Sequence, residues 1–443
     1  MSTNRPTDDA NMDLSLRDRF YRVLEKDKVE DVKRFLKIGV NVNAVLEVKP
    51  FTQTEDGEDV LIPWQDYIKN ETKGLSARQI RIWSMTFVKE YTTPLYITAS
   101  KGYIECMRHL LDRRADVNYS PNGWSPLHAA VDGGHVDAVQ LLINHGADVD
   151  LETEDTGKTA LHMCCGKDYL KIAKLLLRRG TNINAKTYDV EETPLHVAAQ
   201  NGLFDLVDLL LEKGADPNAT NNEGDTPLAL ACTCTEGDSY YHNTVEKLIQ
   251  WGADVNLKDK EKKLPLHNAA RKGDHKLVEI LVRKGSEINA RDYFLKTPLF
   301  DAVAASEIAG MGAEGVVKGK PEKCVQILLN FGAWRIFPEI FHRVLVMCAS
   351  YPPTIEVLIN AYPRVKVPSL WMESIPKDAL VKFRDFYDAF ETLGSSPGSL
   401  QHLARSSLRD FLGRRCHTVI SQLGIAPRLK RYLLLEPGEA GLH

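Results

Sequence analysis

The chain contains 443 residues, of which 43% are hydrophobic, and its 56 lysines and arginines against 60 aspartates and glutamates give a formal net charge of −4. This composition allows a sizeable buried core and excludes global disorder, and the balanced charge excludes a nucleic-acid-binding surface spread over the whole chain. There is no run of 18 apolar residues, and the 8 cysteines form no Cys-x-x-Cys pair, so we expect no transmembrane helix and a reducing, intracellular compartment.

The N-terminal part of the chain is its least regular part. Residues 1–18 are polar and lack the apolar stretch of a secretory signal, so we expect them to be disordered. Residues 19–44 predict a degenerate copy of the repeated unit that follows. Residues 45–90 form an insert with two tryptophans and a mixed-charge stretch, and their pattern predicts no particular structure.

A repeated phrase, Pro-Leu-His or a variant of it, organises residues 91–336. Its leucine recurs with spacings of 32, 34, 34, 33, 38 and 33 residues, at Leu95, Leu127, Leu161, Leu195, Leu228, Leu266 and Leu299. A second phrase, such as Gly-Ala-Asp-Val-Asp, opens 19 residues after the leucine in most copies, but 24 after it in the fifth and 33 in the seventh. We therefore expect seven repeats, with insertions near 232–243 and 305–320.

Each repeat predicts two helices. A hydroxyl residue such as Ser125 precedes a proline, a combination that caps and opens a helix. The second helix carries apolar residues at helical spacing, as in Val207, Leu210 and Leu211, and the glycine after it tolerates the positive φ of a C-cap. One such unit cannot bury its apolar face alone, so the repeats must stack into a solenoid.

These features resemble the ankyrin repeat, which is about 33 residues long and carries Thr-Pro-Leu-His-x-Ala. After the last repeat, residues 337–363 predict a degenerate helical pair, and we expect 337–388 to form capping helices.

The C-terminal segment 389–443 changes character. A Gly/Ser/Pro cluster at 394–399 precedes an apolar stripe that predicts one helix over 399–413. A second short helix is expected over 416–423, and a third follows Pro427.

This segment resembles a SOCS box, and the chain as a whole resembles the ankyrin repeat and SOCS box family. The segment 423–433 matches that family's closing Leu-Pro-x-Pro-x-x-Leu-x-x-Tyr-Leu at its leucines and its tyrosine. The departures are Ala404 in place of a cysteine, and Gly424 and Ala426 in place of prolines. The implied fold is all-α, an ankyrin-repeat solenoid with a C-terminal three-helix SOCS box.

The resemblance implies a non-catalytic substrate-recognition subunit of an E3 ubiquitin ligase. In that family the first box helix docks on elongin C, which comes with elongin B, and the closing segment selects cullin-5 with its RING subunit. The matching elongin-binding residues are Ser399, Leu400, Leu403, Ala404 and Leu408. The matching cullin-binding residues are Leu423, Ile425, Pro427, Leu429, Tyr432 and Leu433. The alternative is an ankyrin scaffold whose box stabilises the solenoid and recruits no ligase.

The tips of the loops between repeats are the candidate substrate surface, because they line the concave side of such a stack. Their aromatic residues are Trp124, Tyr188, Tyr293 and Phe294. These side chains are either anchors for a protein partner or packing against the neighbouring loop. Lysines cluster over 258–263 and acidic residues over 152–155, so the tips either form a polarised surface that steers a charged partner or are merely solvated.

Other motifs favour structural roles. The histidines His128, His162, His196 and His267 recur once per repeat, which favours hydrogen bonds between turns over a metal site. Neither Cys164-Cys165 nor the pair Cys232/Cys234 has zinc-ligand spacing, and Gly310–Gly315 matches a dinucleotide fingerprint without the strand that should precede it. We therefore expect no metal, no cofactor and no catalytic site.

Two further expectations concern modification and location. The Asp/Glu-x-Asn sequences at Asn118, Asn218, Asn256 and Asn289, each with a leucine eight residues earlier, resemble asparagine hydroxylation sites of ankyrin proteins. That leucine and that asparagine are also structural parts of the repeat, so both interpretations stay open. With no membrane or nucleic-acid partner implied, the expected location is cytoplasmic, with the nucleus as a second compartment.

Overall fold

The computed structural model describes residues 14–47, 51–53, 59–61, 91–233, 239–310, 319–336, 340–362, 367–393, 408–409, 412, 416–425 and 427–435. Within these ranges the chain is helical apart from two short two-stranded ribbons, which confirms the all-α prediction in its main point. The chain divides into two compact units, Met1–Asp189 and Val190–His443.

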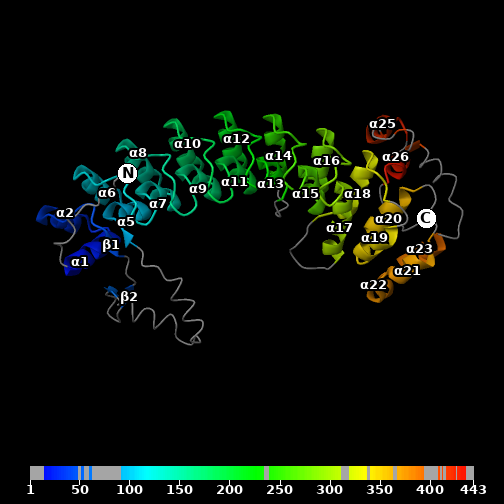
Figure 1. The fold of residues 1–443 in the computed structure, drawn as a ribbon, viewed down its shortest axis with the longest axis horizontal. Helices are drawn as coiled ribbons and strands as arrows, with labels where there is room; N and C mark the ends of the chain where they lie inside the picture. The colour runs from blue at the N-terminus through cyan, green and yellow to red at the C-terminus, as the bar shows by residue number, and fades with distance from the viewer. Residues whose placement is uncertain are drawn as a thin grey trace. The chain divides into compact units, whose positions relative to one another are not determined.

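The first unit is a stack of helical pairs (Figure 1). Its helices are α1 (Leu14–Glu25), α2 (Val29–Ile38), α5 (Pro94–Lys101), α6 (Ile104–Asp112), α7 (Pro126–Asp132), α8 (Val136–Asn144), α9 (Ala160–Lys167) and α10 (Leu170–Arg178). The first helices of the pairs pack in one row, α1 on α5, α5 on α7 and α7 on α9, and the second helices pack in another, α2 on α6, α6 on α8 and α8 on α10. The degenerate copy predicted over 19–44 therefore continues the stack, but its first helix begins at Leu14, so the last residues of the segment 1–18 are helical and not disordered as expected.

The only strands among the described residues lie within or directly after the insert between the first two pairs. Strand β1 (Leu46–Glu47) pairs antiparallel with β4 (Tyr91–Thr92), and this ribbon joins the end of the degenerate copy to the start of the first full repeat. Within the insert, β2 (Phe51–Gln53) pairs antiparallel with β3 (Asp59–Leu61).

The second unit continues the same pattern of pairs (Figure 1). Its repeat helices are α11 (Pro194–Gln200), α12 (Phe204–Glu212), α13 (Pro227–Ala231), α14 (Ser239–Gln250), α15 (Pro265–Arg271), α16 (His275–Arg283), α17 (Pro298–Gly310) and α18 (Pro321–Asn330). The row α11, α13, α15, α17 and the row α12, α14, α16, α18 extend into the next pair, α19 (Phe341–Cys348) and α20 (Pro352–Asn360). The degenerate pair over 337–363 is thus a further layer of the stack.

After α20, the described residues of the second unit contain three helices before the box and two in it. They are α21 (Ser369–Ser374), α22 (Lys377–Lys382), α23 (Arg384–Leu393), α25 (Cys416–Gln422) and α26 (Pro427–Leu433). Aromatic contacts hold the first of these on the stack: the rings of Phe341 and Trp371 stack with centroids 4.6 Å apart. The Tyr387 hydroxyl donates a hydrogen bond to the Ala349 carbonyl oxygen at 2.9 Å.

The repeated phrase explains both the core and the helix starts. Each of the seven phrase leucines is at most 2% exposed, so each contributes about 1.5–3 kcal/mol of burial. The preceding hydroxyl caps the helix as predicted: the Thr93 side chain accepts the Tyr96 backbone N–H at 3.1 Å. At Ser125 the cap is reciprocal, because His128 also accepts the Ser125 backbone N–H.

Candidate protein-interaction surfaces

The described part of the C-terminal box has a small core of its own. Its buried members are Cys416, Ile420, Leu433 and Leu434, and the half-buried Leu408, Leu412 and Ile425 pack against them. Burial raises the pKa of the Cys416 thiol, so the side chain stays protonated and acts as a small apolar residue. The two helices that build this core, α25 and α26, lie where the apolar pattern predicts them.

A buried arginine joins the box to the last repeat. The Arg409 guanidinium donates hydrogen bonds to Asn330 Oδ1 at 2.6 Å and to the Leu433 carbonyl oxygen at 2.9 Å, and the residue is only 7% exposed. From helix α18, the Asn330 and Gln326 amides donate to the Leu434 carbonyl oxygen at 2.8 and 2.9 Å. These bonds satisfy the polar groups that docking of the box removes from water.

Apolar contact completes this junction. The rings of Phe331 and His417 stack with centroids 4.8 Å apart. A cavity of about 170 Å³ lies beside the junction, lined by Leu329, Gly332, Ala333, Arg335, Ala361, Arg409 and Cys416. The junction was not predicted from the sequence. The one sequence feature that indicates it is Arg409, which directly follows Leu408 of the predicted apolar stripe.

The predicted elongin-binding residues lie mostly beyond what the structure describes. Ser399, Leu400, Leu403 and Ala404 fall outside the described residues. Leu408 is described, is half-buried and packs on the box core, so it connects the predicted docking helix to α25 and α26. The assignment of these residues to elongin C stays a prediction.

The predicted cullin-binding residues separate into exposed and buried groups. Leu423 is 37% exposed, Leu429 is 46% exposed, and Pro427 is also exposed. Leu433 is buried and Ile425 half-buried in the box core, so these two support the segment from inside. Tyr432 lies in α26. The exposed leucines are the part of this segment that can meet a partner directly.

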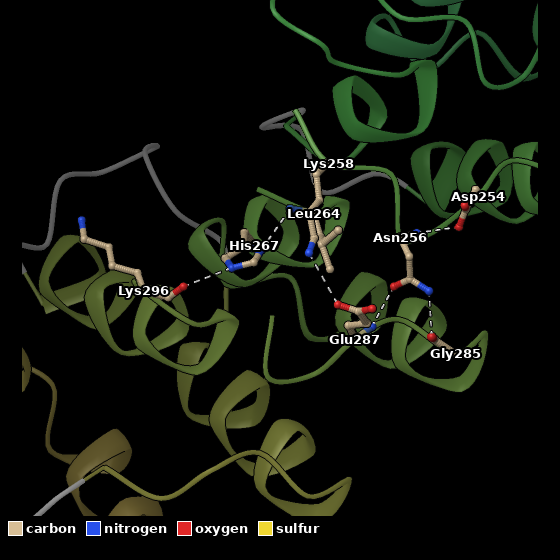
Figure 2. A network of polar contacts seen from close by, with 8 residues as sticks. All are labelled: Asp254, Asn256, Lys258, Leu264, His267, Gly285, Glu287 and Lys296. Carbon is tan, nitrogen blue, oxygen red and sulfur yellow. Dashed lines mark hydrogen bonds and ion pairs between the residues drawn. The ribbon is translucent and has the colours of Figure 1, made fainter. Parts of the chain in front are cut away.

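Two of the recurring histidines, His196 and His267, tie a tip to its own helix and to the next tip. In Figure 2, His267 Nδ1 accepts the Leu264 backbone N–H at 3.0 Å, and the other ring nitrogen lies 3.4 Å from the Lys296 carbonyl oxygen. An accepting Nδ1 requires the neutral ring with its proton on Nε2, and burial lowers the pKa of His267 in agreement with that form. His196 makes the same pair of contacts, which is the structural role that the spacing favours.

Asparagines form a second ladder between repeats. The Asn256 amide donates to the Gly285 carbonyl oxygen at 3.1 Å, and its Oδ1 accepts the Glu287 N–H at 2.8 Å (Figure 2). Asn218 and Asn289 bond to the next repeat in the same way. These contacts support the structural interpretation of the Asp/Glu-x-Asn phrases, and hydroxylation stays a prediction.

Two of the four predicted substrate residues lie in the first unit. Trp124 is half-buried and meets the ring of His128 edge-on at 6.3 Å, which is the packing alternative. Tyr188 is exposed, and its hydroxyl donates to Glu152 Oε2 at 2.6 Å, a bond that raises the pKa of the phenol. Its surroundings are the acidic tip over 152–155.

The other two predicted residues belong to a wider exposed surface in the second unit. Tyr293 and Phe294 are 68% and 63% exposed, and the next residue, Leu295, is 70% exposed. Trp334 is exposed as well, with the Arg291 guanidinium 5.2 Å from its ring centroid. The exposure of Leu295 and Trp334 was not predicted, because the sequence does not show whether an apolar residue in a loop is exposed or packed.

Within the described ranges, no group of three His, Cys, Asp or Glu side chains gathers as a metal site, and seven cysteines are free and buried. Most of the Gly310–Gly315 motif falls outside those ranges. None of the described helices has both the length and the apolar character that crossing a bilayer requires. The candidate functional residues that the structure describes are therefore the exposed side chains of the box and of the tips, which can contact another protein.

Comparison with known proteins identifies the family. Residues 95–187, 186–259 and 234–333 match the family described as ankyrin repeats in three copies, and residues 396–434 match the SOCS box. Ankyrin repeat and SOCS box protein 10 of Homo sapiens is 39% identical over 381 residues, which cover 84% of this chain and 79% of that protein. This chain belongs to the ankyrin repeat and SOCS box family.

Other members of the family are similar over most of the chain. Ankyrin repeat and SOCS box protein 16 of Mus musculus is 34% identical over 386 residues, covering 86% of this chain and 82% of that protein. The crystal structure of the human ASB11 ankyrin repeat domain is 26% identical and covers 54% of this chain and 97% of that one, with a TM-score of 0.43. Family membership, with a SOCS box present, supports a substrate-recognition role in a SOCS-box ubiquitin ligase.

Proposed function

We propose that this chain is the substrate-recognition subunit of an elongin B/C–cullin-5–RING E3 ubiquitin ligase and carries out no chemistry itself. The first box helix docks on elongin C, the 423–433 segment contacts cullin-5, and the ankyrin repeats hold the protein substrate. Holding a substrate beside a charged ubiquitin-conjugating enzyme raises its effective concentration there. The same proposal places the chain in the cytoplasm, with the nucleus as a second location.

The observation that carries the proposal is the arrangement of the box. Its core is internally packed and bound to α18 through Arg409, while Leu423 and Leu429 stay exposed. A box that only stabilised the stack would gain nothing from exposed leucines. Leucines that bind a partner protein are exposed in the isolated chain and become buried in the complex, which is the role that the family's partners would give Leu423 and Leu429.

The alternative, a scaffold whose box only stabilises the repeats, has one observation in its favour. The bonds from Asn330 and Gln326 to Leu434 are what such a box would need. The two functions differ in one property, which is whether elongins bind.

Co-expression of the full chain with elongins B and C tests the proposal. The wild-type chain is expected to co-purify with both elongins, and Leu400→Asp is expected to lose them, because the change places an unpaired charge in an apolar groove. Leu370→Asp is the matched control, since Leu370 is 58% exposed outside the box. A wild-type chain that recovers no elongins would support the scaffold instead, and recovery by Leu400→Asp equal to that of the control would show that 399–408 is not the docking helix.

A further inference from the structure

Two neighbouring tips in the second unit form one continuous surface. The first spans 257–263 and the second 290–296, and the Tyr293 backbone N–H donates to the Glu261 carbonyl oxygen at 2.7 Å. This bond places Tyr293 beside the lysines of the first tip. We call Lys260, Lys262, Tyr293, Phe294, Leu295 and Lys296 the basic–aromatic tip surface.

The apolar residues of this surface do not serve the fold. Tyr293, Phe294 and Leu295 are all more than half exposed, so they contribute little to burial. Leu295 also has φ +61°, a left-handed backbone that is unfavourable for a leucine. The same position has positive φ in the other tips, where it is glycine at Gly123, Gly157 and Gly224 and an exposed charged residue at Glu191 and Lys262, so Leu295 is the one apolar residue among them. A strained, exposed leucine brings neither packing nor turn geometry, which points to a use outside the folded chain.

The acidic groups of the two tips are held by hydrogen bonds of the turns or by an ion pair. Asp259 Oδ1 accepts the Lys263 N–H at 2.8 Å, and the buried Asp292 accepts the Lys296 N–H at 2.7 Å. Glu261 is paired with the Lys263 ammonium, and this pairing lowers the pKa of Glu261. The carboxylates of this region are therefore already engaged in turns or in an ion pair.

The cationic groups, by contrast, face outward. Lys260 and Lys262 are exposed, and neither forms an ion pair with any residue that the structure describes. The Lys296 ammonium lies 5.6 Å from the ring centroid of Phe294 and 5.4 Å from that of Phe300. The surface thus combines positive charge with exposed apolar area.

We propose that the basic–aromatic tip surface binds an acidic protein segment in which carboxylates flank an aromatic or aliphatic anchor residue. The anchor packs among Tyr293, Phe294 and Leu295, and the carboxylates pair with Lys260 and Lys262. The proposal rests on the proposed function, because it gives the chemical class of the substrate segment that the repeats hold.

A protein segment fits this surface better than single-stranded nucleic acid does. Bases bind such proteins by stacking on free ring faces. Here Tyr293 and Phe294 meet edge-to-face at 85°, with centroids 5.5 Å apart, and Lys296 covers the face of Phe294. Ring edges and methyl groups are presented instead, which suit an apolar side chain.

Selection from a random twelve-residue phage-displayed peptide library on the full chain tests the proposal. Enriched peptides are expected to carry Asp or Glu around an aromatic or aliphatic residue. A fluorescein-labelled peptide of the enriched sequence should bind at least tenfold more weakly to the double variant Tyr293→Ser/Phe294→Ser. Lys260→Glu/Lys262→Glu should also bind at least fivefold more weakly, with a difference that shrinks as salt increases.

Matched controls lie elsewhere in the chain. Trp251→Ser removes an exposed aromatic residue that lies outside the tips, and Lys276→Glu reverses an exposed lysine on α16; both should bind the peptide as wild type does. All variants are first compared by circular dichroism and by elongin co-purification. Because peptide binding is measured without any ligase component, its failure leaves the elongin test unaffected.

Four outcomes would overturn the proposal. The first is enrichment of basic peptides, or of peptides with no shared composition, and the second is an unchanged peptide affinity in both double variants. The third is displacement of the peptide by oligo-dT. The fourth is that the full chain forms a dimer and that Tyr293→Ser/Phe294→Ser converts it to a monomer. The third would assign the surface to nucleic acid and the fourth to a second copy of the chain.

Discussion

Single residues in the repeats follow from local physical requirements. Gly252 and Gly285 each have φ +93°, and a Cβ added at either position would meet nothing within 4 Å. Backbone conformation alone therefore explains these glycines, which is why their spacing along the sequence marks the end of each repeat. The capping hydroxyls and the phrase leucines are equally local, and the sequence predicts them correctly.

Asp301 on helix α17 shows what local pattern could not predict. The residue is buried, its Oδ2 has no hydrogen-bond partner among the described residues, and burial raises the pKa of its carboxyl to about 6. Asp301 occupies position x of the Thr-Pro-Leu-His-x-Ala motif. The sequence does not predict burial at this position, because its burial depends on the neighbouring repeat.

Asp301→Asn is expected to stabilise the chain at pH 7.5. The folded-state pKa lies above the unfolded value of 3.8, so ionised Asp301 costs stability above pH 6, and that cost disappears as pH falls from about 6 towards 4. The melting temperature of the variant should exceed that of wild type at pH 7.5, and the gap should narrow by pH 4.5. If the difference in melting temperature between the variant and wild type stayed the same across this pH range, burial would not penalise the charged form of Asp301.

At the scale of elements, the box and helix α18 depend on each other. The bonds that join them connect residues 79 and 104 positions apart, so no local window of sequence reveals them. The helices α25 and α26, by contrast, were predictable from their apolar spacing and from Pro427. Local periodicity predicts the elements, while the contacts between distant elements need the structure.

Asn330→Ala tests this junction. Removing the side chain takes one of the two described hydrogen-bond partners from the buried Arg409 guanidinium and one of the two from the Leu434 carbonyl oxygen, at a cost of about 2 kcal/mol. Hydrogen exchange of residues 416–435 should accelerate, and the melting temperature should fall. Gln250→Ala, at an exposed position ending α14, is the control. Unchanged exchange in the box would mean that the bonds to α18 do not hold it.

The closing segment of the box offers an opposite test, in which binding improves. A Cβ added at Gly424 would meet nothing within 4 Å, so the position is open to a larger residue. Gly424→Pro/Ala426→Pro restores the family's prolines and lowers the entropy lost when the segment orders on a partner. The elongin-bound chain should bind cullin-5 at least twofold more tightly in calorimetry. An affinity at or below that of wild type would place the cullin contact elsewhere.

At the scale of the whole molecule, stability comes from stacking between neighbouring repeats. Residues 91–336 are therefore expected to fold without residues 389–443. Loss of the box exposes Phe331 and removes the bonds to Asn330, so melting should begin at α17 and α18 while the helical circular dichroism signal of the remaining repeats persists. A soluble truncated chain without helical signal would show that the box is needed by the entire stack.

In the proposed function, substrate capture and ligase recruitment belong to different surfaces, the tips and the box. A change in one should therefore leave the other intact. This separation is the central claim, because a bridge needs both functions and neither by itself makes an adaptor.

Proximity labelling in cells under proteasome inhibition tests this claim most directly. The full chain and its Leu400→Asp variant, each fused to a biotin ligase, are compared for labelled neighbours and for ubiquitin-remnant peptides on those neighbours. We predict that both chains label the same neighbours outside the ligase, and that the ubiquitin-remnant signal on them falls to background with Leu400→Asp. Equal ubiquitination of these neighbours with both chains would contradict the assignment of this protein as a substrate-recognition subunit.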